Sequence, residues 1–125
     1  MGVAEVDYLK RAREVIDIEA RSLRKARNHL GHGFSDAVRL FLDALQRKNK
    51  IVVTGIGKNL HIAQKISATF ASTGSTSVFL NPAQAMHGAL GILDRGDVLL
   101  ALSYSGESEE LIALLGQPPQ PLQLA

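Results

Sequence analysis

The stretch Ile51-Val52-Val53-Thr54-Gly55-Ile56-Gly57 decides the fold class of this sequence. Its first four residues are β-branched and uncharged, which is typical of a short strand buried inside a parallel sheet. Glycines follow the strand directly, and a helical pattern of apolar residues begins near His61. A buried strand that leads through glycines into a helix predicts an α/β fold.

The alternation of strand and helix continues downstream to residue 115. We expect strands over 51–54, 76–80 and 98–102, and helices over 61–70, 83–89 and 107–115. Gly74 ends the first of these helices, and residues 94–97 form a turn before the third strand. Because the connections are short, the pattern predicts a doubly wound parallel sheet.

Two further helices are expected ahead of the sheet. Apolar residues recur at spacings of three and four, or their sum, from Leu9 to Leu30, and Gly31 and Gly33 end this helix. Ser35 is expected to cap a second helix, which fades before residue 50. The two helices either cover one face of the sheet or pack against another subunit. We expect an oligomer that uses them, because a parallel sheet that stops at its third strand leaves an edge to cover.

The expected organisation has three parts: a leading helical segment (1–50), a partial sheet domain (51–115) and a tail (116–125). The tail contains three of the four prolines and no charged residue, so it cannot continue a helix. It is expected to be extended or disordered, and the alternative is a ligand for a polyproline-binding domain. The sheet is thus expected to be truncated after its third strand.

Composition excludes several classes of function. The 125 residues are 46% hydrophobic and 21% charged, and cysteine is absent, which excludes disulfides and thiol catalysis. No pair of histidines has the helical spacing of metal ligands, so no metal is expected. The first ten residues contain no apolar run, and polar residues interrupt the uncharged stretch 66–93. We therefore expect neither a signal peptide nor a membrane span, and the cytoplasm is the expected location.

The net charge is +2, and the cations gather in the leading segment. Residues 1–50 contain eleven Lys or Arg and seven Asp or Glu, whereas residues 51–125 contain three and five. A basic segment is one signal of nucleic-acid binding. The two signs are interleaved, however, and the chain has only six aromatic residues. A solvated helix face is therefore favoured, and no nucleic-acid partner is expected.

Two loops at strand ends are the candidate binding sites, because ligands of open parallel sheets bind beyond the carboxyl ends of the strands. In the first loop, Gly55 and Gly57 allow the backbone to approach a ligand, and Lys58 adds a positive charge. Leu60 stands where a dinucleotide loop requires glycine, and Asn59 stands where a P-loop requires Ser or Thr. A small phosphorylated ligand is therefore expected rather than a nucleotide.

The second loop follows the third strand and contains Ser103, Ser105, Gly106 and Ser108. Three hydroxyl groups and the amides at the start of the following helix can surround a phosphate. The alternative is that these serines only stabilise a turn and cap a helix. The presence of two such loops in one sheet favours the phosphate interpretation.

Four motifs that occur in order carry a family resemblance. They are Gly55-Ile56-Gly57-Lys58, Ala68-Thr69-Phe70-Ala71-Ser72-Thr73-Gly74, Met86-His87-Gly88-Ala89-Leu90-Gly91 and Ser103-Tyr104-Ser105-Gly106-Glu107-Ser108. Up to about Leu115 the sequence resembles the sugar isomerase (SIS) domain family, most closely its arabinose 5-phosphate isomerase branch. The resemblance implies a flavodoxin-like fold and an aldose–ketose isomerase that interconverts D-ribulose 5-phosphate and D-arabinose 5-phosphate. It implies no cofactor, a tetramer with sites at subunit boundaries, and a role in lipopolysaccharide biosynthesis.

The resemblance also implies roles for individual residues. The three serines of the second loop hold the phosphate, and Lys58 stabilises charge on the substrate oxygens. Glu110 corresponds to an active-site carboxylate and is the candidate base, and His87 assists ring opening or proton transfer. Isomerisation through an enediolate needs such groups, because it removes a proton beside a carbonyl and returns it to the neighbouring carbon.

Each of these residues has a structural alternative. Lys58 can be a solvated lysine, although a cation at a helix start opposes the helix dipole and thus favours a ligand role. Glu110 can equally be an ordinary surface acid of a helix. His87 lies in a charge-free stretch, where a buried and hydrogen-bonded histidine is the alternative.

The sequence also departs from the family pattern. Gln84 stands where relatives usually have glutamate, and Ala89 where they usually have aspartate. Two further strands of the family, with another glutamate and a histidine of the active site, have no counterpart. The alternative to an isomerase is therefore a non-catalytic phosphosugar-binding module, either regulatory or a remnant.

Overall fold

The structure is a computed structural model that describes residues 4–85, 89–115 and 123–124. The chain divides into two units, Met1–Phe34 and Ser35–Ala125, which are described separately. The first unit contains α1 (Tyr8–His29), and the Asp7 carboxylate caps this helix by accepting a hydrogen bond from the Lys10 amide at 3.0 Å. The expected leading helix is therefore confirmed, and none of its residues is buried.

The next helix, α2 (His32–Gln46), begins earlier than the sequence predicts. The Phe34 amide donates a hydrogen bond to the Gly31 carbonyl at 3.1 Å, so a helical turn forms ahead of Ser35. Gly33 lies inside the helix. The prediction that Ser35 caps this helix is therefore wrong, because the backbone of the glycine segment has already closed the first turn.

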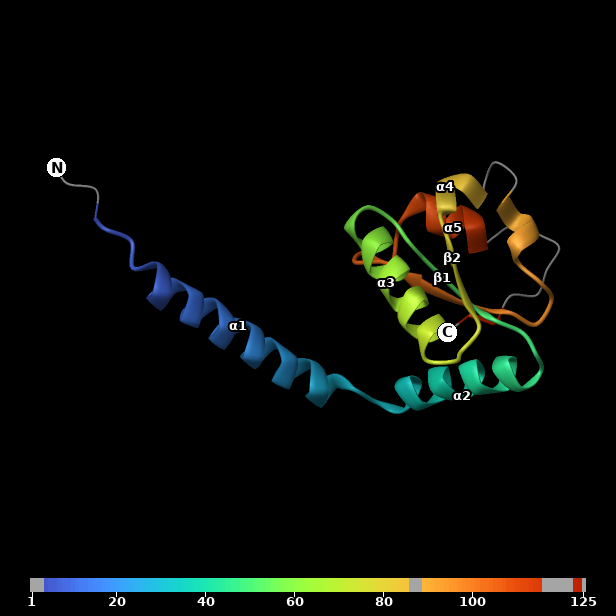
Figure 1. The fold of residues 1–125 in the computed structure, drawn as a ribbon, viewed down its shortest axis with the longest axis horizontal. Coiled ribbons are helices and arrows are strands. Elements are labelled where there is room, and N and C mark those ends of the chain that lie inside the picture. Colours follow the sequence, from blue (N-terminus) through green and yellow to red (C-terminus); the bar gives the residue numbers. More distant parts are fainter. Residues whose placement is uncertain (1–3, 86–88, 116–122, 125) are drawn as a thin grey trace. The chain divides into compact units, whose positions relative to one another are not determined.

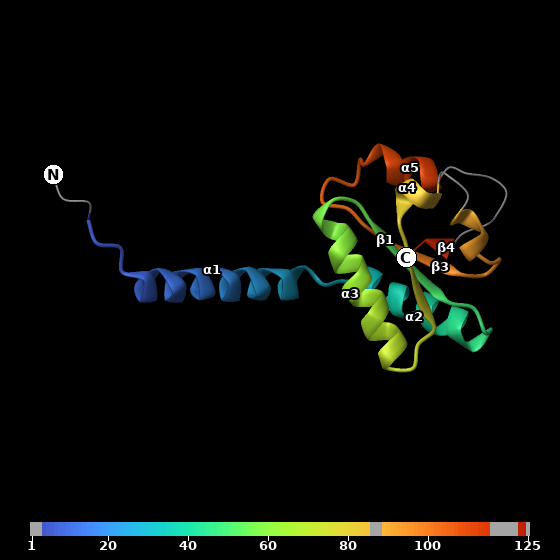
Figure 2. The same cartoon turned by 45° about the horizontal axis from the view of Figure 1, so that its top comes forward.

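The second unit contains a parallel sheet with the strand order β2-β1-β3-β4 (Figures 1 and 2). Its strands are β1 (Ile51–Gly55), β2 (Ser77–Leu80), β3 (Val98–Leu102) and β4 (Gln123–Leu124). The three strand pairs are all parallel, which confirms the predicted sheet. The sequence predicts three strands, and the structure adds the two-residue β4 beside Val98 and Leu99. The remaining tail residues lie outside the described ranges.

Helices cover both faces of the sheet (Figures 1 and 2). On one face lies α3 (Lys58–Ser72), and on the other lie α4 (Pro82–Ala85) and α5 (Glu109–Leu115). A 3₁₀ turn, η1 (Ala89–Ile92), follows α4, and residues 86–88 of the predicted short helix lie outside the described ranges. None of the helices in the part of the chain that the structure describes combines the length and hydrophobicity needed to cross a membrane.

The core has two parts because successive residues of β1 point to opposite faces of the sheet. Ile51 and Val53 pack with Ala63 of α3, whereas Val52 packs with Leu80 and other residues of the opposite face. The first part is extended by partly buried residues of α2, α3 and the strands: Phe41, Leu45, Ile66, Phe70, Phe79, Leu100 and Leu102. Burial on both faces explains why β1 is a continuous apolar run rather than an alternating one.

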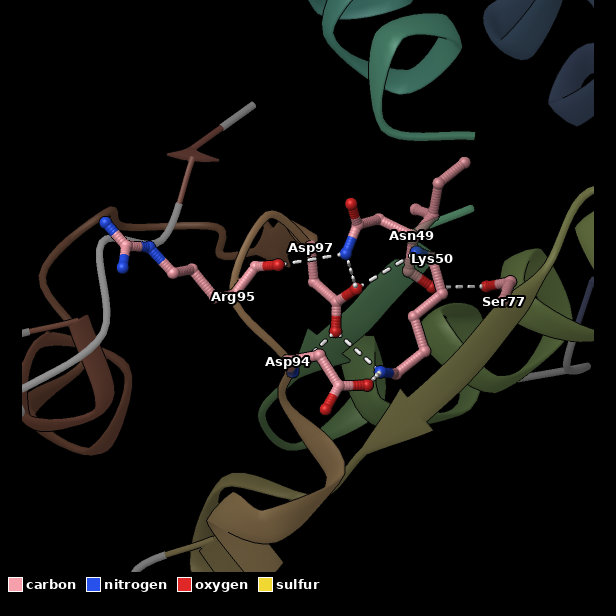
Figure 3. Close-up of polar contacts among 7 residues, drawn as sticks. Asn49, Lys50, Ser77, Asp94, Arg95 and Asp97 are labelled. Carbon is pink, nitrogen blue, oxygen red and sulfur yellow. Dashed lines mark hydrogen bonds and ion pairs between the residues drawn. The ribbon is translucent and has the colours of Figure 1, made fainter. Parts of the chain in front are cut away.

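A buried carboxylate joins the start of β1 to the start of β3 (Figure 3). Asp97 Oδ1 accepts hydrogen bonds from the Lys50 amide at 3.0 Å and from the Asn49 side-chain amide at 3.3 Å. Asp97 Oδ2 accepts hydrogen bonds from Lys50 Nζ at 2.6 Å and from the Asp94 amide at 2.8 Å. The Asp97 side chain is only 1% exposed, and its donors belong to the two segments that lead into these strands. The carboxylate therefore holds the two strands in register.

The charged forms of this pair are favoured by their mutual contacts. Burial disfavours a charge on Asp97, but hydrogen bonds from Lys50 Nζ and from two backbone amides outweigh it and lower the pKa of Asp97. Burial likewise opposes the charge on Lys50, and hydrogen bonds to Asp94 and Asp97 outweigh it and raise the pKa of Lys50. A carboxyl whose pKa is lowered by folding stabilises the folded state above its unfolded pKa, and this stabilisation is lost as the pH falls through the folded value.

We expect Asp97→Asn to lower the free energy of unfolding at pH 7 by about 3 kcal/mol, because the substitution removes the buried one of the two carboxylates that pair with the mostly buried Lys50 ammonium. Urea unfolding monitored by circular dichroism measures this difference. The matched control Asp94→Asn changes a side chain that is 74% exposed, and it should cost less than about 1 kcal/mol. The difference between the native protein and Asp97→Asn should shrink as the pH falls below about 4. A difference that does not change with pH would contradict this account.

Candidate functional site

Two loops leave the sheet side by side at the carboxyl ends of β1 and β3. These strands are parallel neighbours, and Gly55 at the end of β1 pairs with Leu102 at the end of β3. The residues that follow, Ile56 and Ser103, therefore begin their loops at the same level of the sheet. We call residues 55–59 the glycine loop and residues 103–108 the serine loop.

The glycine loop makes a close turn from β1 into α3. A Cβ atom on Gly55, which is buried, would lie 2.7 Å from the carbonyl oxygen of Asn59, so a side chain does not fit there. Gly57 precedes the helix with φ +62°, a conformation that side chains rarely adopt. Lys58 is exposed and is the first residue of α3. The helix thus starts three residues before the predicted His61, and both glycines are required by the turn itself.

The serine loop is held by its own side chains. The Gly106 amide donates a hydrogen bond to Ser103 Oγ at 2.9 Å, and the Glu107 amide donates one to Ser105 Oγ at 3.1 Å. The Oγ atoms of Ser103 and Ser108 lie 3.3 Å apart and share a hydrogen bond. The serines therefore do stabilise a turn, and α5 begins two residues later than predicted, at Glu109.

Stabilising the turn leaves hydrogen-bond donors on the serine hydroxyl groups. A serine hydroxyl that accepts a hydrogen bond from an amide keeps its own hydrogen as a donor. The Ser105 side chain, whose residue is exposed, accepts in this way from Glu107, so its hydroxyl hydrogen is available to a ligand. A hydrogen bond from such a donor to a phosphate oxygen is charge-assisted and stronger than a neutral one. The loop geometry thus fixes the oxygen atoms and leaves donors for an anion.

A hollow of about 400 Å³ lies beside the serine loop, between α3 and the end of β3. Ser103 and Tyr104 border it on the β3 side, and Asn59 of the glycine loop borders it on the α3 side. The rest of its lining is apolar: Ile62, Ile66, Ala101 and Leu102. Asn59 and Tyr104 were not among the predicted site residues, although both stand inside the two predicted loops.

Of the two remaining candidate residues, only one lies in the part of the chain that the structure describes. Glu110 lies in the first turn of α5, which follows the serine loop, whereas His87 lies outside the described residues. The sequence has three Lys or Arg residues between positions 51 and 115. Of these, Lys58 lies in the glycine loop, and the other two lie outside both loops. Among the residues that the structure describes, no group of three or more His, Asp or Glu is placed to hold a metal ion.

We expect Gly55→Ala to lower the free energy of unfolding by about 1–3 kcal/mol, because its methyl group would overlap the Asn59 carbonyl and displace the start of α3. The matched control is Gly33→Ala in α2, where a Cβ atom meets no atom within 4 Å. The control should be neutral or stabilising, because alanine favours a helix over glycine by up to about 1 kcal/mol. Urea titrations of both variants measure the effect, and an equal stability of Gly55→Ala and the native protein would contradict this role.

Comparison with known proteins assigns the fold to a family. The SIS domain matches residues 44–117 of this chain. The chain is 36% identical over 115 residues to arabinose 5-phosphate isomerase KdsD of Francisella tularensis, covering 92% of this chain and 35% of the relative. It is 37% identical over 131 aligned positions to arabinose 5-phosphate isomerase GutQ of Escherichia coli K12, covering 94% of this chain and 40% of the relative. The chain thus spans a little over a third of the length of these relatives.

Comparison with solved structures supports the same family assignment. The fold matches an Escherichia coli CFT073 protein solved in complex with arabinose 5-phosphate, with a TM-score of 0.80 and 30% identity, covering 90% of this chain and 58% of that one. It matches a putative phosphosugar isomerase involved in capsule formation from Bacteroides fragilis with a TM-score of 0.75 and 35% identity, covering 90% and 63%. The doubly wound sheet, the two loops at its strand ends and these similarities show that the chain belongs to the SIS domain family.

Proposed function

We propose that this chain binds a sugar phosphate at the glycine and serine loops and interconverts D-ribulose 5-phosphate and D-arabinose 5-phosphate. The observation that carries the proposal is the pairing of Gly55 with Leu102, because it brings the two anion-suited loops to one edge of the sheet. The relatives named as arabinose 5-phosphate isomerases, and the similar structure with bound arabinose 5-phosphate, support the substrate class.

The phosphate is assigned to the serine loop. Ser105 offers a hydroxyl hydrogen, and Ser103 and Ser108 stand on the same loop within hydrogen-bonding distance of each other. Gly106 has φ +72°, which lets the loop curve around a small group without a side chain in the way. Lys58, at the start of α3, supplies positive charge from the neighbouring glycine loop. Hydroxyl and amide donors with one cation suit a monosaccharide phosphate better than the longer phosphate chain of a nucleotide.

The reaction moves one hydrogen between neighbouring carbon atoms of the open-chain sugar. A base removes the proton from C2 of the aldose, the electrons form an enediolate, and a proton is returned to C1 to give the ketose. We assign the role of the base to Glu110. His87 is assigned either the opening of the sugar ring or the proton transfer to and from the substrate oxygens. Lys58 is assigned to the negative charge that develops on the enediolate oxygens. No cofactor is needed, because the substrate and the product have the same oxidation state overall.

The proposal includes further subunits and a cellular role. We propose a homo-oligomer, with a tetramer as the working assembly, in which neighbouring copies contribute to closing the site. The product would supply an arabinose 5-phosphate pathway that leads to lipopolysaccharide, and the cytoplasm is the proposed location. These proposals rest on the family resemblance and on the relatives' names.

We expect Ser105→Ala to weaken binding of arabinose 5-phosphate by about 10- to 100-fold, because a hydrogen bond to a charged group contributes about 1.5–3 kcal/mol. Titration calorimetry measures the dissociation constants. The matched control is Ser72→Ala at the far end of α3, where the hydroxyl only donates to the Thr69 carbonyl, and it should leave binding unchanged. Equal affinities of Ser105→Ala and the native protein would exclude the serine loop as the phosphate site.

We expect Glu110→Gln to lower turnover by at least about 100-fold while sugar phosphate binding changes little, because a general base contributes about that much to a proton transfer. The control is Glu109→Gln, one residue earlier in the same helix, which should keep its activity. Proton NMR in deuterium oxide gives a second readout, since an enediolate mechanism exchanges the C2 hydrogen of the aldose with solvent. Binding without turnover or exchange in the native protein would exclude the isomerase and support a non-catalytic phosphosugar-binding module.

A further inference from the structure

Tyr104 lies at the tip of the serine loop and has no packing role in the fold. Its side chain is fully exposed, so no residue that the structure describes in Ser35–Ala125 covers it. The hydrogen bonds that hold the loop use the side chains of Ser103 and Ser105, which flank Tyr104 in the sequence. A single exposed apolar side chain is common on protein surfaces. The position of Tyr104 between two proposed phosphate ligands is what points to a function.

The hollow beside the serine loop has the character of a small-molecule site. Its volume of about 400 Å³ lies within the range of about 300–1,000 Å³ that is typical of ligand pockets. Such pockets combine a mostly apolar lining with a few polar groups that orient the ligand. The polar residues of this lining are Asn59, Ser103 and Tyr104. Ser103 Oγ already takes part in hydrogen bonds with Gly106 and Ser108, so Asn59 and Tyr104 are the other polar groups for a ligand.

Asn59 and Tyr104 border the hollow from its two sides. Asn59 belongs to the α3 side and follows Lys58 directly, whereas Tyr104 belongs to the β3 side and lies between the first two serines of the serine loop. In the proposed site the phosphate is held by the serine loop, and the reacting end of the sugar meets Lys58. The carbon chain that connects these two ends must then pass between Tyr104 and Asn59.

We propose that Tyr104 and Asn59 hold the sugar part of the substrate and thereby select a monosaccharide phosphate from other phosphates. This inference rests on the proposed sugar phosphate site. The Tyr104 ring covers the C–H groups of the carbon chain, while its hydroxyl group stays in contact with water. The Asn59 side-chain amide both donates and accepts hydrogen bonds, as a sugar hydroxyl does. The two residues thus contribute to the affinity for the sugar and not to the affinity for the phosphate.

Substitution of Tyr104 tests this division of roles. We expect Tyr104→Ala to weaken binding of arabinose 5-phosphate by about 10-fold, because the sugar loses the apolar surface that it covers. Binding of inorganic phosphate should stay unchanged. Tyr104→Phe keeps the ring and should recover most of the lost affinity. Titrations of the full-length chain, followed by NMR through the backbone amide signals of the serine loop, measure the dissociation constants, and circular dichroism verifies that the variants are folded.

The two ligands separate this inference from the proposed function. Equal binding of both ligands by Tyr104→Ala and the native protein would overturn the role of Tyr104, whereas the phosphate site would stand. An equal loss of affinity for both ligands would place Tyr104 in the phosphate site and would overturn its role toward the sugar. Absence of binding of either ligand to the folded native protein would overturn the proposed site itself, and the inference with it.

Asn59 is tested through the configuration of the sugar. D-Arabinose 5-phosphate and D-ribose 5-phosphate differ at C2, which lies at the end of the sugar that is assigned to Lys58. We expect the native chain to prefer the arabinose compound by at least about 10-fold and Asn59→Ala to reduce this preference to about 2-fold, because the variant loses a hydrogen bond to a hydroxyl group. The matched control is Gln64→Ala, an exposed amide residue of α3 outside the lining of the hollow, which should keep the native preference. An unchanged preference in Asn59→Ala would overturn the role of Asn59.

Discussion

The Asp97 carboxylate sets the relative position of the two strands that carry the candidate site. Its donors come from the segments that begin β1 and β3, and its lowered pKa keeps it charged beside Lys50. Because the strands are parallel and five residues long, fixing their starts also fixes their ends. The pairing of Gly55 with Leu102 follows, and with it the level at which both loops leave the sheet. The buried ion pair at the amino-terminal ends of β1 and β3 thus positions the candidate site at their carboxyl-terminal ends.

Within the site, the same residue types serve the fold and the proposed ligand. Gly55 is required because the start of α3 passes too close for a side chain, and this close passage also brings Lys58 and Asn59 to the strand edge. Ser103 and Ser105 accept hydrogen bonds from loop amides, and Ser105 keeps its hydroxyl hydrogen as a donor for a ligand. A loop that is already held in place loses little conformational entropy when it binds an anion. Preorganisation, rather than a high positive charge, is therefore the physical basis of the proposed phosphate site.

The sequence predicted the parts of this structure that depend on local patterns. The apolar run of β1 indicated a parallel sheet, and the glycine and serine loops could be placed at strand ends because each follows such a run. The Ser35 cap was wrong, since the turn closed by Gly31 and Phe34 took precedence. Neither the Asp97 contacts nor β4 could be predicted, because both join segments that lie far apart in the chain. The hollow beside Asn59 and Tyr104 likewise depends on how α3 packs on β3.

The central claim is that the two loops at the ends of β1 and β3 bind the phosphate of a sugar phosphate. The most direct measurement is a titration of ¹⁵N-labelled protein with arabinose 5-phosphate, followed through the backbone amide signals by NMR. The account predicts that the largest shifts arise from the serine loop, with smaller ones from the glycine loop, and that inorganic phosphate moves the same serine-loop signals. Shifts confined to other parts of the chain, or none at all in the folded protein, would contradict it.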